Sequence, residues 1–387
     1  MRKSPGPLLR PAMAAALLLA ALCAPVRAEA APPSPPSAEA VAPSPPAAEA
    51  RRLPFTERYR ATRHGGIVRA ANTSISCRAT GPRAAAACPA VRAGGKGTNG
   101  DFDMFYVDVD SDPHTYNSSR AEVRLPEGSR VTYARLYWGG NLRVGEQKPP
   151  KDNGRVLVAE PGGQYKALLA DTVVGHRAAH GADAFQASAD VTRLVRDSGS
   201  GLYTVAQVNV AMGRSTAGAW GGWTLVVAYE NPGLPLRHLA VLDGFDALNS
   251  RTPQEIRLGG LRLARNGTGR AGLVAYDGDR GRTGDSFTVS TGPGSNTVLA
   301  GPGGPRDDVL NSTISEAGAP APERVPSYAH TLGYDSDVFE LGNALRRGGD
   351  HLAFRLVSQR DAAWAGVLFV VVDARQQARS GPSRARP

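Results

Sequence analysis

The chain has 387 residues and a formal net charge of +10, which is nearly all arginine because the lysines are only Lys3, Lys96, Lys148, Lys151 and Lys166. The arginines are scattered, with no dense basic block and no interleaved aromatic platform, so the charge does not indicate specific nucleic-acid binding. Arginine is interpreted as the general surface cation of this chain, and attraction to anionic cell-wall polymers stays open as a non-specific effect.

The N-terminus has the pattern of a secretory signal peptide. Arg2, Lys3 and Arg10 precede an apolar run over residues 13–23, and the cleavage-site patterns Val26-Arg27-Ala28 and Ala28-Glu29-Ala30 follow. A membrane-spanning helix needs about 20 apolar residues, and this run is too short. We therefore expect residues 1–30 to be removed and the mature protein to be secreted, soluble, monomeric and free of a membrane anchor.

The segment after the signal peptide has the composition of a linker. It contains APPSPPSAEA followed by VAPSPPAAEA, an imperfect repeat of Pro, Ala, Ser and Glu that cannot bury a core. We expect a Pro/Ala-rich linker over residues 31–62 and a disordered basic tail over residues 375–387.

Two cysteines of the mature chain lie close together among Gly, Pro and Ala. Cys77 and Cys88 have no histidine nearby that would complete a zinc site. In an exported protein such a pair is expected to form a disulfide.

Between about residues 63 and 374, short apolar or alternating segments are separated by Gly, Pro, Asn and Asp. This spacing, with no long helical period, predicts an all-β protein of antiparallel sheets packed as sandwiches, with short helical turns only. The strands are expected at 104–107, 121–125, 131–138, 155–158, 203–210, 223–229, 239–242, 256–263, 272–276, 352–357 and 367–372, and the helical turns at 190–195 and 336–345.

A weak internal duplication indicates two related lobes. Asp190-Val191, a strand and Trp220-Gly-Gly in the first half match Asp337-Val338, a strand and Trp364-Ala-Gly in the second. Asp190 and Asp337 would each cap the helical turn that follows. We expect jelly-roll-like β-sandwich lobes at residues 63–232 and 233–374, divided at the NPGLPL segment.

The amino-acid sequences of several segments resemble those of a known family. DFDMFYVDVDSDPHTYNSSRAEVRLPEGSRVTYARLYWGG, WGGWTLVVAYENP and LVAYDGDRGRTGDS are similar to a secreted domain of unknown function in surface and exported proteins of high-GC bacteria and archaea. In that family the domain often precedes repeated β-sandwich modules that lead to a cell-wall anchor. The resemblance implies a fold and a location outside the cytoplasm, and it brings no established activity.

Two acidic segments are candidate calcium loops. Asp108, Asp110 and Asp112 give the D-x-D-x-D opening of such a loop, although Pro113 and Ser119 depart from the rest of the pattern. The same spacing also fits a solvated acidic stripe, because alternate residues of a strand share a face. In the second segment, Asp277, Asp279 and Asp285 stand among glycines, which suits Ca²⁺ as well as an ordinary turn. Calcium is the only cofactor that these residues suggest.

The four tryptophans allow two interpretations. Trp220 and Trp364 occupy duplicated positions and are expected in the core. Trp138 and Trp223 are the candidates for stacking on the apolar face of a sugar ring.

No catalytic signature is present, since the chain lacks a G-x-S-x-G elbow, an H-E-x-x-H pair and a complete phosphate loop. The sequence thus favours a secreted, non-enzymatic binding or structural module of the cell envelope, with an extracellular glycan or cell-wall polymer as its partner. The alternative is a secreted hydrolase acting on polysaccharide with aspartate acid/base residues, whose separation only a structure shows.

Calcium binding by either loop predicts a measurable gain in stability. Binding to the native state stabilises by RT ln(1 + [L]/Kd), about 2.7 kcal/mol at 100 times Kd. The midpoint of thermal unfolding should then be higher in millimolar calcium than in excess chelator, and Asp110→Asn should reduce the difference. Identical midpoints would mean that the aspartates form only a solvated stripe.

Overall fold

The computed structural model describes residues 53–375 except residues 80, 249–252, 302 and 319–320, and side chains 81–86, 176 and 177 are also left undescribed. The expected signal peptide, most of the expected linker and the tail beyond Arg375 lie outside the described residues. The chain divides into two compact units, 1–44 and 45–387, and all described residues belong to the second. Residues 53–62, expected in the linker, are paired in a sheet.

The described unit is almost entirely antiparallel β-structure, which confirms the fold class expected from the sequence. Its largest sheet has ten strands in the order β17-β19-β14-β21-β12-β1-β11-β5-β9-β8, and only the short pair β17·β19 is parallel. The strands of this sheet are β1 (Leu53–Thr73), β5 (Arg130–Asn141), β8 (Thr172–Ala179), β9 (Ala182–Asp190), β11 (Gly221–Glu230), β12 (Leu236–Ala247), β14 (Gly269–Tyr276), β17 (Ile314–Ser315), β19 (Tyr334–Glu340) and β21 (Trp364–Asp373).

Two smaller sheets cover the large one. A two-stranded sheet and short helices lie in the segments that connect the strands of these three sheets. The five-stranded outer sheet contains β18 (Arg324–Val325), β4 (Ser118–Val123), β10 (Gly201–Ala206), β6 (Arg155–Ala159) and β7 (Lys166–Leu169). The four-stranded outer sheet contains β13 (Gln254–Leu258), β20 (Leu352–Val357), β15 (Ser286–Ser290) and β16 (Thr297–Val298). The remaining elements are β2 (Ile75–Cys77), β3 (Met104–Tyr106), α1 (Gly81–Arg92), α2 (Thr192–Ser198), and the 3-10 turns η1 (Asn99–Asp101), η2 (Pro150–Asp152) and η3 (Gly342–Leu345).

Strand β1 divides the ten-stranded sheet into two halves. Its first part pairs with β12 and its second part with β11, and the change occurs at Gly65. A Cβ atom at Gly65 would lie 2.1 Å from the carbonyl oxygen of Tyr229, so only glycine allows this close approach. We call the strands on the β11 side (β11, β5, β9, β8) half-sheet A and those on the β12 side (β12, β21, β14, β19, β17) half-sheet B.

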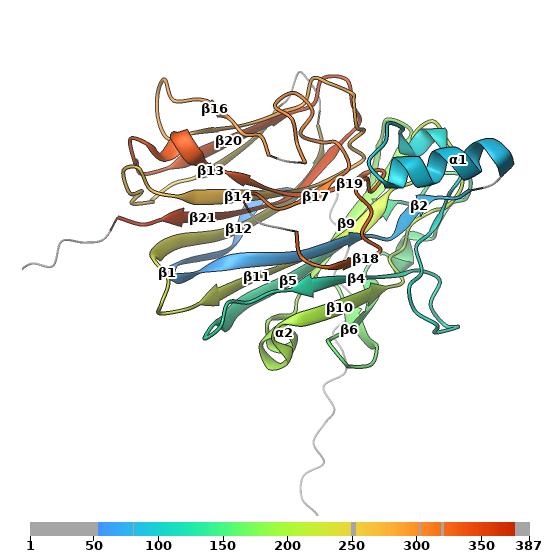
Figure 1. Ribbon diagram of the computed structural model, residues 1–387, viewed down its shortest axis with the longest axis horizontal. Helices are drawn as coiled ribbons and strands as arrows, with labels where there is room; N and C mark the ends of the chain where they lie inside the picture. The colour runs from blue at the N-terminus through green and yellow to red at the C-terminus, as the bar shows by residue number, and fades with distance from the viewer. Residues whose placement is uncertain (1–52, 80, 249–252, 302, 319–320, 376–387) are drawn as a thin grey trace, which may run out of the picture. The chain divides into compact units, whose positions relative to one another are not determined.

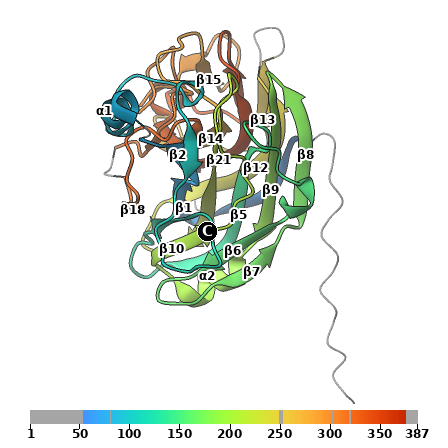
Figure 2. The same cartoon turned by 90° about the vertical axis from the view of Figure 1, so that its right-hand side faces the viewer.

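The two halves repeat one topology, which confirms the two related sandwich lobes. From the central neighbours β1 and β12 outward, the order is β11-β5-β9-β8 on one side and β21-β14-β19-β17 on the other. The outer sheets run β4-β10-β6-β7, with β18 added beside β4, and β13-β20-β15-β16. In Figure 1 the layers follow one another from β20 and β13 at the top, through β14, β21 and β12, to β11 and β5, and then to β10 and β6 at the bottom. The turned view of Figure 2 shows β5, β9 and β8 side by side in half-sheet A.

Three apolar cores fill the spaces between the four layers. One lies between half-sheet A and its outer sheet, a second between half-sheet B and its outer sheet, and a third between the two half-sheets. We call this third core the interlayer. It contains Trp220 and Trp364, whose ring centroids are 5.0 Å apart, and both indoles are fully buried as expected from the duplication.

Glycines let the aromatic rings of one half-sheet approach the backbone of the other. A Cβ atom at Gly139 in half-sheet A would lie 3.1 Å from the ring of Tyr276, and one at Gly222 would lie 2.8 Å from the ring of Tyr334. The hydroxyl groups of Thr224 and Tyr334 form a hydrogen bond of 2.7 Å across the same interlayer.

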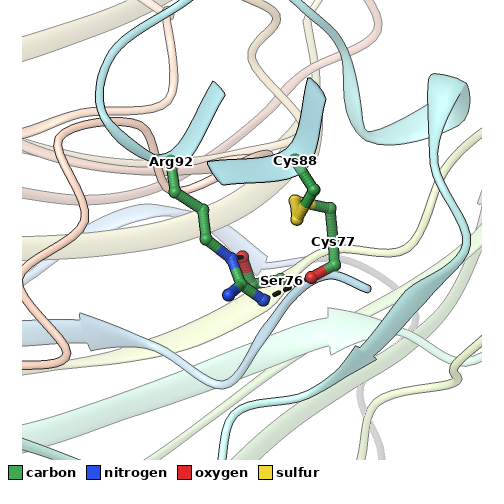
Figure 3. Close-up of a disulfide and its surroundings, with 4 residues drawn as sticks. All are labelled: Ser76, Cys77, Cys88 and Arg92. Atoms are coloured by element: carbon green, nitrogen blue, oxygen red, sulfur yellow. Dashed lines mark hydrogen bonds between the residues drawn. A yellow bond between two sulfur atoms is a disulfide. The ribbon is translucent and has the colours of Figure 1, made fainter. Parts of the chain in front are cut away.

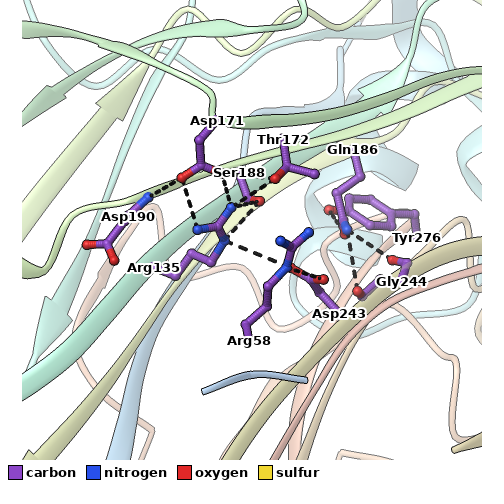
Figure 4. Close-up of polar contacts among 11 residues, drawn as sticks. Arg58, Arg135, Asp171, Thr172, Gln186, Ser188, Asp190, Asp243, Gly244 and Tyr276 are labelled. Atoms are coloured by element: carbon purple, nitrogen blue, oxygen red, sulfur yellow. Dashed lines mark hydrogen bonds and ion pairs between the residues drawn. The ribbon is translucent and has the colours of Figure 1, made fainter. Parts of the chain in front are cut away.

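A buried ionic network also joins the two half-sheets (Figure 4). The carboxylate of Asp243 on β12 accepts a hydrogen bond of 2.7 Å from Arg58 Nε on β1, and Arg135 Nε on β5 lies 3.9 Å from its other oxygen. Arg135 also forms an ion pair with Asp171. Burial raises the pKa of Asp243 in spite of the two arginines, so its ionised form depends on them.

The helical turns differ in part from the sequence prediction. Asp190 precedes the N-cap residue Val191 and is not itself the cap, although its carboxylate accepts a hydrogen bond of 2.8 Å from the backbone N–H of Thr192, where α2 begins. Asp337 does not cap a turn either, since it lies inside β19 and accepts hydrogen bonds from Thr313 and Ser315. The last residue of β19, Glu340, takes the topological place of Asp190, so the expected helix at 336–345 is a strand followed by the turn η3.

Helix α1, which was not expected, is attached to β2 by the predicted disulfide (Figure 3). Its run of alanines at residues 84–87 favours a helix. The bond between Cys77 and Cys88 confirms the pairing expected from the sequence. Arg92 in the last turn donates to Ser76 Oγ at 3.0 Å and to the carbonyl oxygen of Cys77, which fixes the helix end on β2.

The ionic network predicts the effect of removing the Asp243 charge. Asp243→Asn keeps the shape and leaves Arg58 and the buried Arg135 without that carboxylate, so we expect the free energy of unfolding to fall by about 3 kcal/mol. Glu122→Gln, which removes the partner of the exposed Arg124, is the matched control and should cost less than about 1 kcal/mol. Chemical denaturation measures both, and equal losses would show that the network does not hold the half-sheets together.

Candidate functional site

One end of the interlayer opens into a polar pocket with a volume of about 460 Å³. Both lobes contribute to it, because the β8–β9 turn and the loop before β11 meet the loops after β14 and before β21. The lining residues are Asn99, His180, Thr216, Ala217, Leu248, Asp277, Asp279, Arg282, Ser358, Gln359, Arg360, Asp361 and Ala362. We call it the acidic pocket after Asp277, Asp279 and Asp361.

Asp277 follows β14 directly and is held in an unusual backbone conformation. Its φ is 64°, a region that residues other than glycine rarely adopt, and its N–H donates to the carbonyl oxygen of Gly333 at 2.8 Å. Its side chain is nearly buried and accepts a hydrogen bond of 2.7 Å from Asn99 Nδ2. The position is therefore fixed by contacts from two distant parts of the chain.

Asp279 and Asp361 are joined through the backbone. Asp361 Oδ2 accepts a hydrogen bond from the N–H of Asp279, and Asp279 Oδ2 lies 3.0 Å from Arg282 Nε. Ser358 Oγ donates to the carbonyl oxygen of Asp361 at 2.9 Å, which orders the loop before β21. Two carboxyls from separate loops thus stand next to each other at the pocket.

The electrostatic environment separates the pKa values of these carboxyls. Burial raises the pKa of Asp279 to about 6, against the opposing effect of Arg282. Burial, with the charge of Asp279, raises the pKa of Asp361 to about 8, and burial raises the pKa of Asp277 well above its ordinary value. Near pH 7 the pocket consequently contains both protonated and ionised carboxyls.

Further aspartates lie behind the pocket. Asp308 Oδ2 accepts from the N–H of Gly281 at 2.9 Å, and Asp335 Oδ1 accepts from the N–H of Thr313 at 3.1 Å. Asp285 is fully buried, and burial, with the charge of Asp308, raises its pKa to about 7. Asp308 and Asp335 thereby order the loops after β14 and before β17.

The two candidate calcium segments lie in different places. Asp277 and Asp279 line the acidic pocket and Asp285 stands behind it, while Asp108, Asp110 and Asp112 lie in the loop between β3 and β4. There Asp110 Oδ1 accepts from the N–H of Asp112 at 2.8 Å, and Asp110 Oδ2 accepts from Tyr165. Among the described residues, no group of three or more His, Cys, Asp or Glu side chains is arranged to hold a metal ion.

Trp138 and Trp223 are not stacking residues, contrary to the expectation from the sequence. Both are fully buried between half-sheet A and its outer sheet. Their indole N–H groups donate at 2.8 Å to the carbonyl oxygen of Asn153 and to Ser119 Oγ. No face of either ring is open to a sugar, because the outer sheet covers the face of half-sheet A on which both rings lie. The alternation of residues along a strand does not show whether a second sheet covers that face.

The sequence interpretation missed Asp361 and Asn99. Asp361 stands three residues before Trp364, just as Ala217 stands three residues before the duplicated Trp220, and both line the pocket. The duplicated tryptophans could therefore have indicated that the loops before β11 and before β21 lie at the same end of the interlayer. Asn99 comes from η1, and nothing in its surroundings in the sequence indicates a contact with Asp277.

Comparison with known proteins gives a family match over part of the chain. Residues 99–261 match the model of a family described as a protein of unknown function, DUF3344. This agrees, for that range, with the resemblance to a domain of unknown function. No curated protein matches the chain.

Solved structures show only weak likeness. A peptide-N(4)-(N-acetyl-beta-D-glucosaminyl) asparagine amidase is 11% identical, with 81% of this chain and 97% of that chain covered and a TM-score of 0.23. PNGase F, a glycosylasparaginase from Flavobacterium meningosepticum, is 14% identical, with 70% and 95% covered and a TM-score of 0.21. The STIV MCP is 8% identical, with 66% and 92% covered and a TM-score of 0.20. At such TM-scores the likeness carries no functional argument.

No helix in the described part of the chain has the length and apolar character needed to cross a membrane.

The raised pKa of Asp285 predicts that stability falls as the pH rises. A carboxyl whose folded pKa is above its unfolded value of about 3.9 stabilises the fold when protonated, and this contribution is lost between about pH 4 and the folded pKa of about 7. Asp285→Asn should remove the effect, so that its free energy of unfolding at pH 8 exceeds that of the natural protein by on the order of 3 kcal/mol, with a much smaller difference at pH 4.5.

Chemical denaturation at both pH values measures the difference. Asp197→Asn, at an exposed position in α2, is the control and should leave the pH dependence unchanged. A gain for Asp285→Asn that is the same at pH 4.5 and pH 8 would show that Asp285 does not titrate in this way.

Proposed function

We propose that this protein is a secreted, non-enzymatic binding module of the cell envelope, and that its acidic pocket binds a hydroxyl-rich ligand, an extracellular glycan. The observation that carries the proposal is the meeting of Asp277, Asp279 and Asp361 with Asn99 and Arg282 at the junction of the two lobes. The secretory pattern of the first 30 residues supports a location outside the cell.

The pocket has the hydrogen-bonding capacity that sugar hydroxyls need. Each hydroxyl both donates and accepts, so a binding site for several of them requires donors and acceptors close together. Ionised Asp279 accepts, the guanidinium of Arg282 donates, and a protonated Asp361 does both. Ala217, Leu248 and Ala362 supply apolar surface for the C–H faces of a ring.

A second candidate function, a polysaccharide hydrolase, is favoured by the difference between two pKa values. Asp361, with a pKa of about 8, is protonated near neutral pH as a general acid must be, while Asp279, with a pKa of about 6, is ionised as a base or nucleophile must be. Their carboxyls lie on adjacent loops joined by the Asp279 N–H. Hydrolysis of a glycosidic bond uses two carboxyls in these roles.

Glycan binding should depend on the pocket carboxyls. On a glycan array probed with the mature protein, we expect binding to a subset of glycans, and a loss of about tenfold or more in affinity for Asp279→Asn, because a hydrogen bond to a charged group contributes about 1.5 to 3 kcal/mol. Asp112→Asn, in the loop between β3 and β4, is the matched control and should bind normally.

The remaining outcomes separate the alternatives. The protein would be a hydrolase if it releases reducing sugar from a bound polysaccharide and if Asp361→Asn abolishes this release while binding is retained. Binding that disappears in chelator would assign the ligand contact to calcium. Equal glycan affinity of Asp279→Asn and the natural protein would show that the acidic pocket is not the glycan-binding site.

A further inference from the structure

The opposite end of the interlayer has a second pocket, with a volume of about 490 Å³. It is lined where β14 begins, at Gly269 and Arg270, and where β21 ends, at Val371, whereas the acidic pocket follows the end of β14. Strand β1 crosses between the half-sheets here and contributes Ile67 and Arg69. We call it the arginine pocket after Arg69.

Apolar side chains from both half-sheets form much of the lining. Ile67 comes from β1, Val338 from β19, and Phe369 and Val371 from β21. The ring of Phe369 covers Gly272, where a Cβ atom would lie 1.9 Å from it, so the ring is held in place. A pocket of a few hundred Å³ with apolar walls and a few polar groups is the usual form of a small-molecule site.

The polar group at the centre of the argument is the guanidinium of Arg69, which is only 2% exposed. Its Nη2 donates to the carbonyl oxygen of Ser315 at 2.5 Å and lies 3.7 Å from Glu316 Oε2. Its Nε–H is buried without a hydrogen-bond partner among the described residues. A buried donor left unpaired is unfavourable, and an acceptor on a ligand would remove that loss.

The arginines of the lining differ in how fully their donors are used. Arg69, Arg237 and Arg270 each face a carboxylate, but of the three only Arg69 has a buried N–H without a hydrogen-bond partner among the described residues. Arg270 is already paired with Glu340 at 2.9 Å. Arg237 is paired at 3.2 Å with Asp373, which is not part of the lining.

We propose that the arginine pocket binds a small carboxylate with an apolar body, whose carboxylate accepts the free N–H of Arg69 while its body lies against Ile67, Phe369 and Val371. A charged hydrogen bond of this kind is stronger than a neutral one and selects the anion. This site is independent of the glycan site, since the two pockets share no lining residue.

The test uses octanoate as the probe, with octan-1-ol and octylamine as arms of the same length, in calorimetric titration of the mature protein. We expect octanoate to bind and the alcohol and the amine to bind at least about tenfold more weakly, as the loss of a charged hydrogen bond predicts. Equal affinities for octanoate and octan-1-ol would show that the pocket binds only the apolar chain. Tighter binding of octylamine would show that the pocket prefers a cation, which contradicts the proposal. Absence of octanoate binding would also overturn the proposal.

Two variants place the site. Arg69→Lys keeps the charge and removes the Nε–H, so octanoate affinity should fall by about tenfold. Val371→Trp, at a partly exposed position of the lining, fills the pocket and should abolish binding even if the Arg69 variant does not fold. Arg257→Met, an exposed arginine of the outer sheet, is the control and should leave octanoate binding unchanged. Unchanged octanoate affinity in the Val371→Trp variant would show that octanoate does not bind in the arginine pocket.

Discussion

The structure depends on the packing of half-sheet A against half-sheet B across the interlayer. Each half-sheet is covered on its other face by an outer sheet, so both faces of both half-sheets are removed from water. Burial on both faces accounts for the largest apolar contribution to folding, because the free energy gained scales with the apolar area buried. The interlayer also fixes the relative position of the lobes, since β1 belongs to both and Asp243 binds arginines on β1 and β5.

Both pockets are consequences of this packing. The half-sheets are in close contact where glycines face aromatic rings, at Gly139 and Gly222, and a pocket lies at each end of the interlayer. At one end the loops carry aspartates and at the other β1 carries Arg69, so a single interlayer ends in two pockets of opposite character. The net charge of +10 therefore says little about either site, because the local groups decide what binds.

The acidic pocket arises where the duplication is broken. Three residues before the duplicated tryptophans, the first lobe has Ala217 where the second has Asp361. The second lobe thus supplies the carboxyls, and the first supplies neutral neighbours such as Asn99 and Thr216. Two equivalent acidic loops would have brought like charges together from both sides, which is unfavourable in a desolvated site.

The sequence by itself determined the all-β class, the two related lobes and the bond between Cys77 and Cys88, because strand periodicity, repeated wording and cysteine spacing are local signals. It did not reveal strand β9, whose alternation is weak because its residues are mostly small, nor β1, whose polar and apolar residues are mixed where it crosses between the half-sheets. Only the tertiary structure decided that Trp138 and Trp223 are buried and that Asp361 meets Asp279. Periodicity shows which side chains share a face, but whether another layer covers that face, and which loops from distant segments come together, depends on how the sheets pack.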